Sequence, residues 1–358
     1  MKKNAGRLSK KVFAAMMAGT LMTAMVGANV SAATLGDNIA NANVTIKKQI
    51  TKDSNVYLPD TTFEFSVAPG TAVSASDGQK EIKAGVLEGV SLTDNSITSS
   101  PSENDIGETA ITLSDTATLD VEETAFTEPG VYRYVVTEQS ENPYEGIVYS
   151  NESYFFDVYV EYVGEELTVT AYTFVTDTAS TTKEGNVIFT NDYTKGNENG
   201  GTHDITLNKV VSGNQASHTQ DFAFDVTVTD ADETGEQYYV AFTKNGEESR
   251  ESVTLSSGVK TTIYLKADET ATIYGLSEND TYTIAEQNYS AQGYTTQYTG
   301  DNASGTMGRA DHAITVTNTK NASTPTGITM TYGPYALMVA LAGGMAVLFF
   351  RRRNREDY

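Results

Sequence analysis

The sequence predicts an all-β protein made of two consecutive β-sandwich domains. Stretches that alternate apolar and polar residues recur along the chain, for example at 62–67, 131–138 and 154–162. Successive side chains of a strand point to opposite faces of a sheet, so this alternation indicates strands with one buried face. Clusters such as Pro129-Gly130 and Asn279-Asp280 provide turns between the strands.

The two predicted domains repeat one order of strands on either side of a Gly-rich linker. We assign the first domain to residues 33–195, the linker to 196–203 and the second domain to 204–320. Each domain opens with a lysine-bearing strand, continues with a Phe-x-Phe strand and closes with a strand that ends in Asn. The matching segments are Thr45–Ile50 and Thr206–Val211, Phe63–Phe65 and Phe222–Phe224, and Val187–Asn191 and Ile314–Asn318. Such a repeat predicts two copies of one structural unit.

The N-terminus has the pattern of a secretory signal peptide over residues 1–32. A basic start precedes an apolar run from Val12 to Val26 and small residues at Ser31 and Ala32. We therefore expect export of the protein, with cleavage after Ala32 or Ala33.

In the C-terminal segment 321–358, a Thr-Pro-Thr-Gly motif at 324–327 precedes an uncharged stretch at 328–350 and a basic tail at 351–358. This order of features resembles the cell-wall sorting signal of Gram-positive surface proteins. The uncharged stretch is long enough for a transmembrane helix, and the arginines favour a cytoplasmic tail. The resemblance implies a precursor that stays in the membrane until sortase, a transpeptidase of the cell surface, cuts the motif.

Charge and composition exclude several classes of protein. The chain has 47 acidic and 24 basic residues and a formal net charge of −23, which excludes nucleic-acid binding because that needs a basic surface. It has no cysteine, so its stability outside the cell cannot come from disulfides. The acidic segment 230–235 lacks the later acid of a calcium loop, which favours a turn. We expect neither a metal nor a cofactor.

Six polar residues of the repeat share the apolar face of their strands. Lys48 is in phase with Ile46 and Ile50, whereas its rival Lys47 lies on the opposite face, which favours Lys48. The same alternation directs five further residues into the two cores: Glu138, Asn191, Lys209, Glu286 and Asn318. Isolated buried charges are costly, so each core must bring its Lys, Glu and Asn together.

A Lys, a Glu and an Asn enclosed together can form a covalent cross-link. Desolvation lowers the pKa of Lys and raises the pKa of Glu, which favours a neutral amine beside a protonated acid. The amine is then a nucleophile, and the acid can donate to the Asn carboxamide oxygen and carry protons. Attack on the amide carbon releases ammonia and leaves an isopeptide bond. Fixed geometry can contribute about 7–11 kcal/mol to such a reaction.

These features resemble the major pilins of Gram-positive bacteria, the sortase-assembled backbone subunits of the streptococcal T-antigen type. The likeness rests on the lysine-bearing opening strands, the segment 126–132 before Glu138, the two closing strands that end in Asn, and Pro325-Thr326-Gly327. The resemblance implies two Ig-like sandwiches in tandem, each with a self-formed bond between its first and last strands. The bonds and catalysts that it implies are Lys48–Asn191 with Glu138, and Lys209–Asn318 with Glu286.

The resemblance also implies a route to a polymer. Sortase would cleave between Thr326 and Gly327 and pass the acyl group to a lysine of another subunit. In the family that lysine lies shortly before the last strand of the first domain, which indicates Lys183 here, with Lys195 as the alternative. The implied partners are sortase, identical subunits, minor pilins and peptidoglycan, with host surface ligands as further candidates.

The expected function is that of a structural shaft subunit of a wall-anchored pilus on the cell surface. The protein would not be an enzyme beyond its single self-reaction. The alternative is a wall-anchored adhesin or minor pilin built from the same domains, which needs no acceptor lysine. A wall-anchored enzyme is a third hypothesis, and it requires a pocket with catalytic groups outside the two triads.

Overall fold

The structure is a computed structural model, and it describes residues 44–76, 80–140, 143–176, 183–184, 187–196, 200–232, 235–322 and 337–346. The predicted signal peptide at 1–32, the motif at 324–327 with its cleavage site Thr326-Gly327, and the tail at 351–358 lie outside the described residues. Of the predicted membrane segment only 337–346 is described, and it is helical. In the described part of the chain no helix has the length and apolar character needed to span a membrane.

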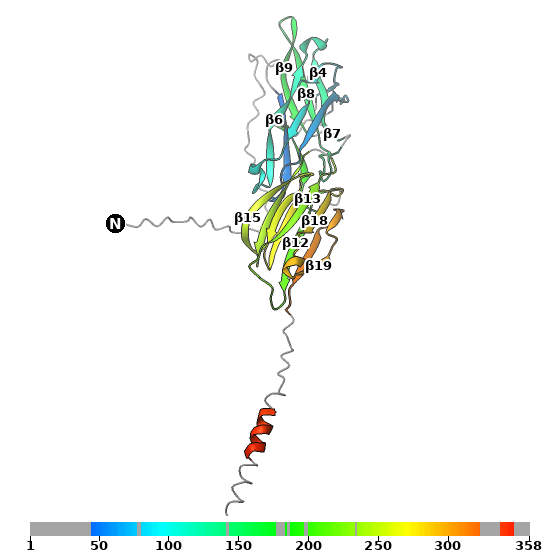
Figure 1. Cartoon of the computed structure of the whole chain (residues 1–358). Coiled ribbons are helices and arrows are strands. Elements are labelled where there is room, and N and C mark those ends of the chain that lie inside the picture. The colour runs from blue at the N-terminus through cyan, green and yellow to red at the C-terminus, as the bar shows by residue number, and fades with distance from the viewer. Residues whose placement is uncertain are drawn as a thin grey trace, which may run out of the picture.

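The first half contains two sheets, which agrees with the prediction of a mainly β fold (Figure 1). Four strands lie in the order β11 (Val187–Tyr193), β1 (Val44–Lys52), β6 (Ala110–Val121) and β4 (Val90–Leu92). The seven-stranded sheet has the order β10 (Lys183–Glu184), β9 (Glu166–Val175), β8 (Ser153–Val163), β7 (Gly130–Gln139), β2 (Thr61–Pro69) and β5 (Ser96–Ser99), with β3 (Lys83–Ala84) beside β7. Short 3-10 turns are η2 (Glu103–Asp105) and η3 (Glu123–Ala125).

The second half also contains two sheets, and Figure 1 shows the two halves arranged end to end. Six strands lie in the order β15 (Glu247–Ser256), β14 (Gln237–Lys244), β17 (Glu269–Leu276), β12 (His203–Ser212), β21 (His312–Thr319) and β19 (Thr295–Gly300). Four strands lie in the order β16 (Thr261–Leu265), β13 (Phe222–Thr229), β18 (Thr281–Glu286) and β20 (Ser304–Thr306). The 3-10 turn η4 (Ser290–Gln292) precedes β19.

Each pair of sheets encloses its own hydrophobic core. Every second residue of β1 is buried, and β13 buries most of its side chains. Among the fully buried rings are Phe63, Phe156 and Phe189 in the first core and Phe222 and Phe224 in the second. Burying a side chain of this kind contributes about 1.5–3 kcal/mol. A slip of one residue would expose an entire row of these side chains, so the two cores fix the register of the strands.

The first and last strands of each half lie side by side. β1 pairs with β11 in parallel, and β12 pairs with β21 in parallel. In the first pair Lys48 lies opposite Phe189, and in the second Lys209 lies opposite Val316. Each closing Asn therefore lies two residues beyond the partner of the lysine, on the same face of the sheet. The fold thus gives both domains the same offset between Lys and Asn.

A buried ion pair on the other face of β7 was not predicted. Arg133 points away from the core, yet it is only 1% exposed, and its Nε and Nη2 each donate to a carboxylate oxygen of Asp157 at 2.7 Å. The two residues are cross-strand partners on β7 and β8. The segment around Gly70 contacts Arg133, because the Gly70 N–H donates to the Arg133 carbonyl oxygen at 2.8 Å. Bidentate pairing satisfies both buried charges.

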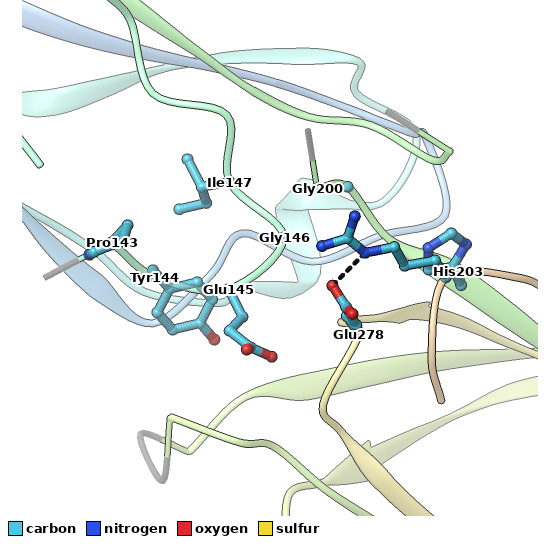
Figure 2. A pocket seen from close by; sticks show the side chains of 10 residues that line it. Pro143, Tyr144, Glu145, Gly146, Ile147, Gly200, His203 and Glu278 are labelled. Atoms are coloured by element: carbon cyan, nitrogen blue, oxygen red, sulfur yellow. Dashed lines mark hydrogen bonds and ion pairs between the residues drawn. The ribbon is translucent and has the colours of Figure 1, made fainter. Parts of the chain in front are cut away.

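The loop before β8 forms hydrogen bonds with the second half of the chain. Ser277 Oγ donates to the Glu145 carbonyl oxygen at 3.2 Å, and the Asn279 N–H donates to the Glu145 carboxylate at 3.1 Å. Gly146 has a φ of +78°, and a side chain there would lie 2.8 Å from Ser277 Oγ, so this position requires glycine. A pocket of about 240 Å³ lies at this junction, and the residues that line it include Glu145, His203, Glu278 and Arg309 (Figure 2).

Two carboxyl groups are buried among hydroxyl groups at the junction. Tyr193 donates to Glu236, which is 3% exposed, while Asp280 is 1% exposed. The Tyr238 hydroxyl lies 3.2 Å from Glu236 Oε2 and 3.0 Å from Asp280 Oδ2. One hydroxyl hydrogen serves only one of these contacts, so the other requires a proton on a carboxyl group. Burial raises the pKa of Asp280 to about 7, and burial together with the Asp280 carboxylate raises the pKa of Glu236 well above its usual range.

The stability of the junction should therefore fall as the pH rises. Burial raises the pKa of Asp280 from 3.8 to about 7, so the stability that its proton contributes is fully present below about pH 4 and is lost as the pH rises to about 7. We expect this group to reduce the free energy of unfolding by about 2–3 kcal/mol between pH 5 and pH 8. Equilibrium denaturant unfolding of the chain and of Asp280→Asn measures the effect. An equally steep pH profile in the variant would contradict this origin.

Candidate functional site

Each half brings its predicted Lys, Glu and Asn into one buried cluster. In the first half these residues come from β1, β7 and β11, and in the second from β12, β18 and β21. The lysine and the asparagine belong to neighbouring parallel strands, and the glutamate comes from the facing sheet. We call the clusters the first triad, which is Lys48, Glu138 and Asn191, and the second triad, which is Lys209, Glu286 and Asn318.

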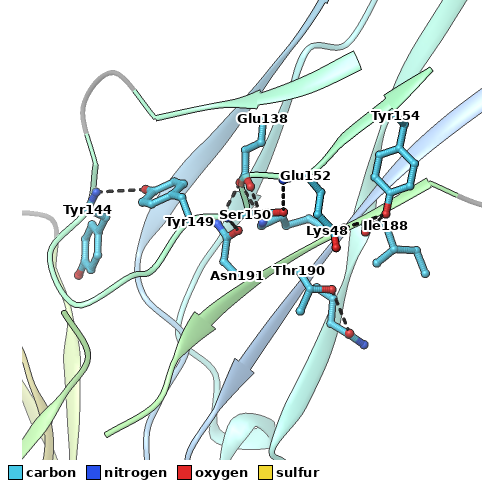
Figure 3. Close-up of polar contacts among 11 residues, drawn as sticks. Lys48, Glu138, Tyr144, Tyr149, Ser150, Glu152, Tyr154, Ile188, Thr190 and Asn191 are labelled. Carbon is cyan, nitrogen blue, oxygen red and sulfur yellow. Dashed lines mark hydrogen bonds and ion pairs between the residues drawn. The ribbon is translucent and has the colours of Figure 1, made fainter. Parts of the chain in front are cut away.

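The carboxylate of Glu138 contacts both other members of the first triad (Figure 3). Lys48 Nζ lies 2.8 Å from Glu138 Oε1 and 3.0 Å from Oε2. Asn191 Nδ2 donates to the same Oε1 at 3.0 Å. The side chains of Lys48 and Glu138 are 0% exposed, and so is Asn191. One carboxylate oxygen therefore links the amine to the amide nitrogen without bulk water between them.

Burial shifts both titratable groups of the first triad towards their neutral forms. Desolvation lowers the pKa of Lys48 to about 8, although the charge of Glu138 and its hydrogen bond act in the opposite direction. Desolvation raises the pKa of Glu138 against the effect of Lys48 and of the Asn191 hydrogen bond. A neutral amine beside a neutral acid is consequently easier to reach here than in water. That form of the pair is the one in which the amine is a nucleophile.

The second triad has the same shared carboxylate oxygen. Lys209 Nζ lies 3.0 Å from Glu286 Oε1, and Asn318 Nδ2 donates to that oxygen at 2.9 Å. The side chains of Lys209 and Glu286 are 0% and 1% exposed. Lys209 also donates to the Val316 carbonyl oxygen at 3.3 Å, and burial lowers its pKa. The Thr296 hydroxyl donates to Glu286 Oε2 at 2.9 Å and fixes the carboxylate from its other side.

The Phe-x-Phe strands provide the apolar surroundings of both lysines. Lys48 Nζ lies 4.7 Å from the centre of the Phe63 ring, and Lys209 Nζ lies 4.4 Å from that of Phe222. The second Phe of each motif is the cross-strand partner of the glutamate, since Phe65 pairs with Glu138 and Phe224 pairs with Glu286. In the sequence these motifs only align the two halves. Their recurrence on the strand that follows each lysine-bearing strand is the signal that could have identified this role.

Ser150 is a member of the first site that sequence analysis did not find. Its backbone N–H donates to Asn191 Oδ1 at 2.8 Å (Figure 3). The predicted chemistry had the glutamate donating to the carboxamide oxygen, whereas the structure places Glu138 at the amide nitrogen instead. The oxygen is occupied by the Ser150 donor, which explains the difference. A backbone donor has no side-chain signature, so no sequence pattern pointed to it.

The other candidate lysines lie in three different places in the structure. Lys47 lies on the opposite face of β1 from Lys48 and pairs with Ile188 and Thr116 across the sheet. Lys183 belongs to β10, at an edge of the seven-stranded sheet, and its side chain lies outside what the structure describes. Lys195 donates to Asp204 and lies 2.8 Å from Asp311.

The described residues do not include a metal-binding arrangement. Within the described ranges, no group of three or more His, Cys, Asp or Glu side chains is placed to hold a metal ion. At the candidate calcium segment, Asp230 Oδ2 instead accepts the Gly235 N–H at 3.2 Å.

Comparison with known proteins gives a family match for each half of the chain. Residues 44–194 match the family of Spy0128-like isopeptide containing domains, and residues 203–320 match a domain of unknown function, DUF7601. A pilin of Streptococcus pyogenes serotype M1 is 27% identical, covering 95% of this chain and 98% of that protein.

Two solved structures share the fold. The major pilin from Streptococcus pyogenes has a TM-score of 0.58 at 24% identity, covering 78% of this chain and 99% of the other. The major pilin T3.2 from Streptococcus pyogenes serotype GAS13637 has a TM-score of 0.55 at 22% identity, covering 78% of this chain and 98% of the other. The chain is therefore similar to a pilin over 95% of its length, and its residues 44–194 match the family of Spy0128-like isopeptide containing domains.

Proposed function

We propose that the chain is the shaft subunit of a covalent pilus on a Gram-positive cell. It is exported, polymerised by sortase and attached to the cell wall, with minor pilins as further partners. Each subunit is reinforced by two self-formed isopeptide bonds, Lys48–Asn191 and Lys209–Asn318. The observation that carries this proposal is the repeated geometry, in which one oxygen of a buried glutamate contacts both the lysine amine and the asparagine amide nitrogen.

The cross-linking reaction balances with the groups of the triad alone. A proton moves from Lys48 Nζ to Glu138, and the neutral amine attacks the Cγ atom of Asn191. The Nζ–Cγ bond forms, the Cγ–Nδ2 bond breaks, and ammonia leaves. Of the two protons that the amine gives up, one ends on the departing nitrogen and the other stays on the glutamate. Glu138 Oε1 is within hydrogen-bond distance of both nitrogens, as this proton transfer requires.

The bonds would supply the stability that the chain cannot obtain from disulfides. Each bond closes a loop of more than 100 residues, which in a chain-entropy account stabilises the folded state by about 4–5 kcal/mol. The bonded strands lie side by side in parallel, so no rearrangement of the sheet is needed. The protein acts on itself once and is otherwise a substrate of sortase.

Polymerisation would join the Thr326 carbonyl group to an amine of the next subunit. Lys195 is a poor acceptor, because the hydrogen bonds to Asp204 and Asp311 outweigh desolvation and raise its pKa. A raised pKa leaves less of the neutral amine that attacks a thioester. Lys183, on the edge strand β10, is therefore the preferred acceptor.

The folded, mature chain should be lighter than its sequence by two molecules of ammonia. Glu138→Gln and Glu286→Gln should each restore one of them, since an amide cannot carry protons between the two nitrogens. Intact-mass spectrometry of the purified chain and of peptides from each domain measures the loss. A wild-type mass equal to that of the sequence would rule out both bonds.

A pair of neighbouring lysines provides a matched control. Lys48→Met should restore one ammonia and reduce the free energy of unfolding by about 4–5 kcal/mol, because the loop is no longer closed. Lys47→Met should retain both bonds and the wild-type stability. Restoration of an ammonia by Lys47→Met alone would show that the assigned register is wrong.

Sortase-dependent polymerisation should require Lys183. When the chain is expressed with its sortase, Lys183→Arg should abolish the ladder of high-mass polymers, and Lys195→Arg should leave it intact. Denaturing electrophoresis of cell-wall extracts measures the ladder. Its survival in Lys183→Arg and loss in Lys195→Arg would reverse the acceptor assignment. A wild-type chain that forms no ladder would favour the adhesin or minor pilin.

A further inference from the structure

We propose that the backbone N–H of Ser150 is a catalytic group that stabilises the oxyanion during formation of the first isopeptide bond. The inference rests on the proposed cross-linking function and goes beyond it, because it assigns unequal reactivity to the two triads. The first domain has a donor at the asparagine oxygen, and the second has none among its described residues. The first bond should therefore form much faster than the second.

The orientation of the Asn191 carboxamide is fixed from both ends. Its Nδ2 donates to Glu138 Oε1 at 3.0 Å, and its Oδ1 accepts the Ser150 N–H at 2.8 Å (Figure 3). A flipped amide would place two donors against each other at Ser150, so the hydrogen bonds determine which atom is the oxygen. Proton transfer therefore takes place at the amide nitrogen and charge stabilisation at the amide oxygen, while the Ser150 N–H also contacts the Glu138 carboxylate.

Local structure holds the Ser150 N–H in this position. The segment before β8 runs along β11, where Val148 and Asp192 exchange two backbone hydrogen bonds of 2.8 and 3.0 Å. Tyr154 then anchors the start of β8 by donating to the Ile188 carbonyl oxygen at 3.0 Å. The donor is therefore in place before any bond forms.

This donor faces the atom on which negative charge develops. When Lys48 Nζ attacks Cγ, electrons move from the carbonyl bond onto Asn191 Oδ1. An amide N–H at 2.8 Å needs no reorganisation to stabilise that charge, and the enclosed core strengthens the interaction. Removal of one such donor from an enzyme costs about 10²–10³-fold in rate.

The second domain has a different neighbour at the corresponding place. Strand β19 lies beside β21, and Thr296 is the cross-strand partner of Asn318. The Thr296 hydroxyl donates to Glu286 and not to the amide. Asn318 Oδ1 is buried, and no described residue donates to it. The second triad therefore has a proton carrier in Glu286, but Asn318 Oδ1 lacks a donor like the Ser150 N–H of the first domain.

The test compares three chains that differ only at the Ser150 donor. Ser150→Ala retains the N–H, Ser150→Pro removes it, and lactate in place of residue 150 removes it by exchanging the amide for an ester without the constraint of proline. Each full mature chain is made by cell-free synthesis, and the ammonia loss of each domain is followed over time by peptide mass spectrometry. The second-domain bond is the internal control for folding.

We expect Ser150→Ala to form the first bond within about twofold of the wild-type rate. The proline and ester chains should form it about 10²-fold more slowly, with an unchanged rate for the second bond. Wild type should complete the first bond before the second. An ester chain as fast as Ser150→Ala, or a second bond that forms as early as the first, would overturn the inference. Loss of no ammonia from the wild type would instead overturn the proposed function.

Discussion

Enclosure of a primary amine in an apolar core is the constraint on which the rest of the structure depends. The side chains of Lys48 and Lys209 have no exposed surface, and each amine lies against a phenyl ring. Burial of a charge costs several kcal/mol unless a partner compensates for it. The partner here is a glutamate whose carboxylate also contacts an asparagine amide. The glutamate carboxylate that compensates for burial of the lysine thus also holds the amine beside the asparagine amide that it attacks.

The alternation of apolar and polar residues predicted much of this site. A polar residue at a position that the alternation assigns to the core can be recognised in a single sequence. The alternation indicated the strands, the repeat and the six triad residues that the structure brings together. It could not indicate the Ser150 donor, which is a backbone group. It also missed the Arg133–Asp157 pair, because alternation assigns that face to solvent and only the folded chain covers it. The carboxyl cluster at Asp280 needs both halves folded, whereas the local sequence shows only a turn.

The parallel arrangement of first and last strands explains why two bonds can arise from one pattern. A parallel pair keeps a constant offset along its length, so a Lys on one strand and an Asn two residues beyond its partner remain on the same face. Both halves use this offset. The facing sheet then supplies the glutamate beside the second Phe of its neighbour strand. The surroundings of the amide oxygen differ because a loop borders β11 where a strand borders β21.

The proposed bonds would carry load differently in the two domains. A polymer joined through Lys183 and the C-terminus would apply force to the first domain before β11 and to the second after β21. In the second domain the Lys209–Asn318 bond offers a covalent route from β12 to β21 that bypasses the intervening strands. In the first domain the pulled chain runs through β11 alone, and the Lys48–Asn191 bond keeps that strand from being drawn out of the sheet. The faster bond would thus belong to the domain in which a single strand bears the load.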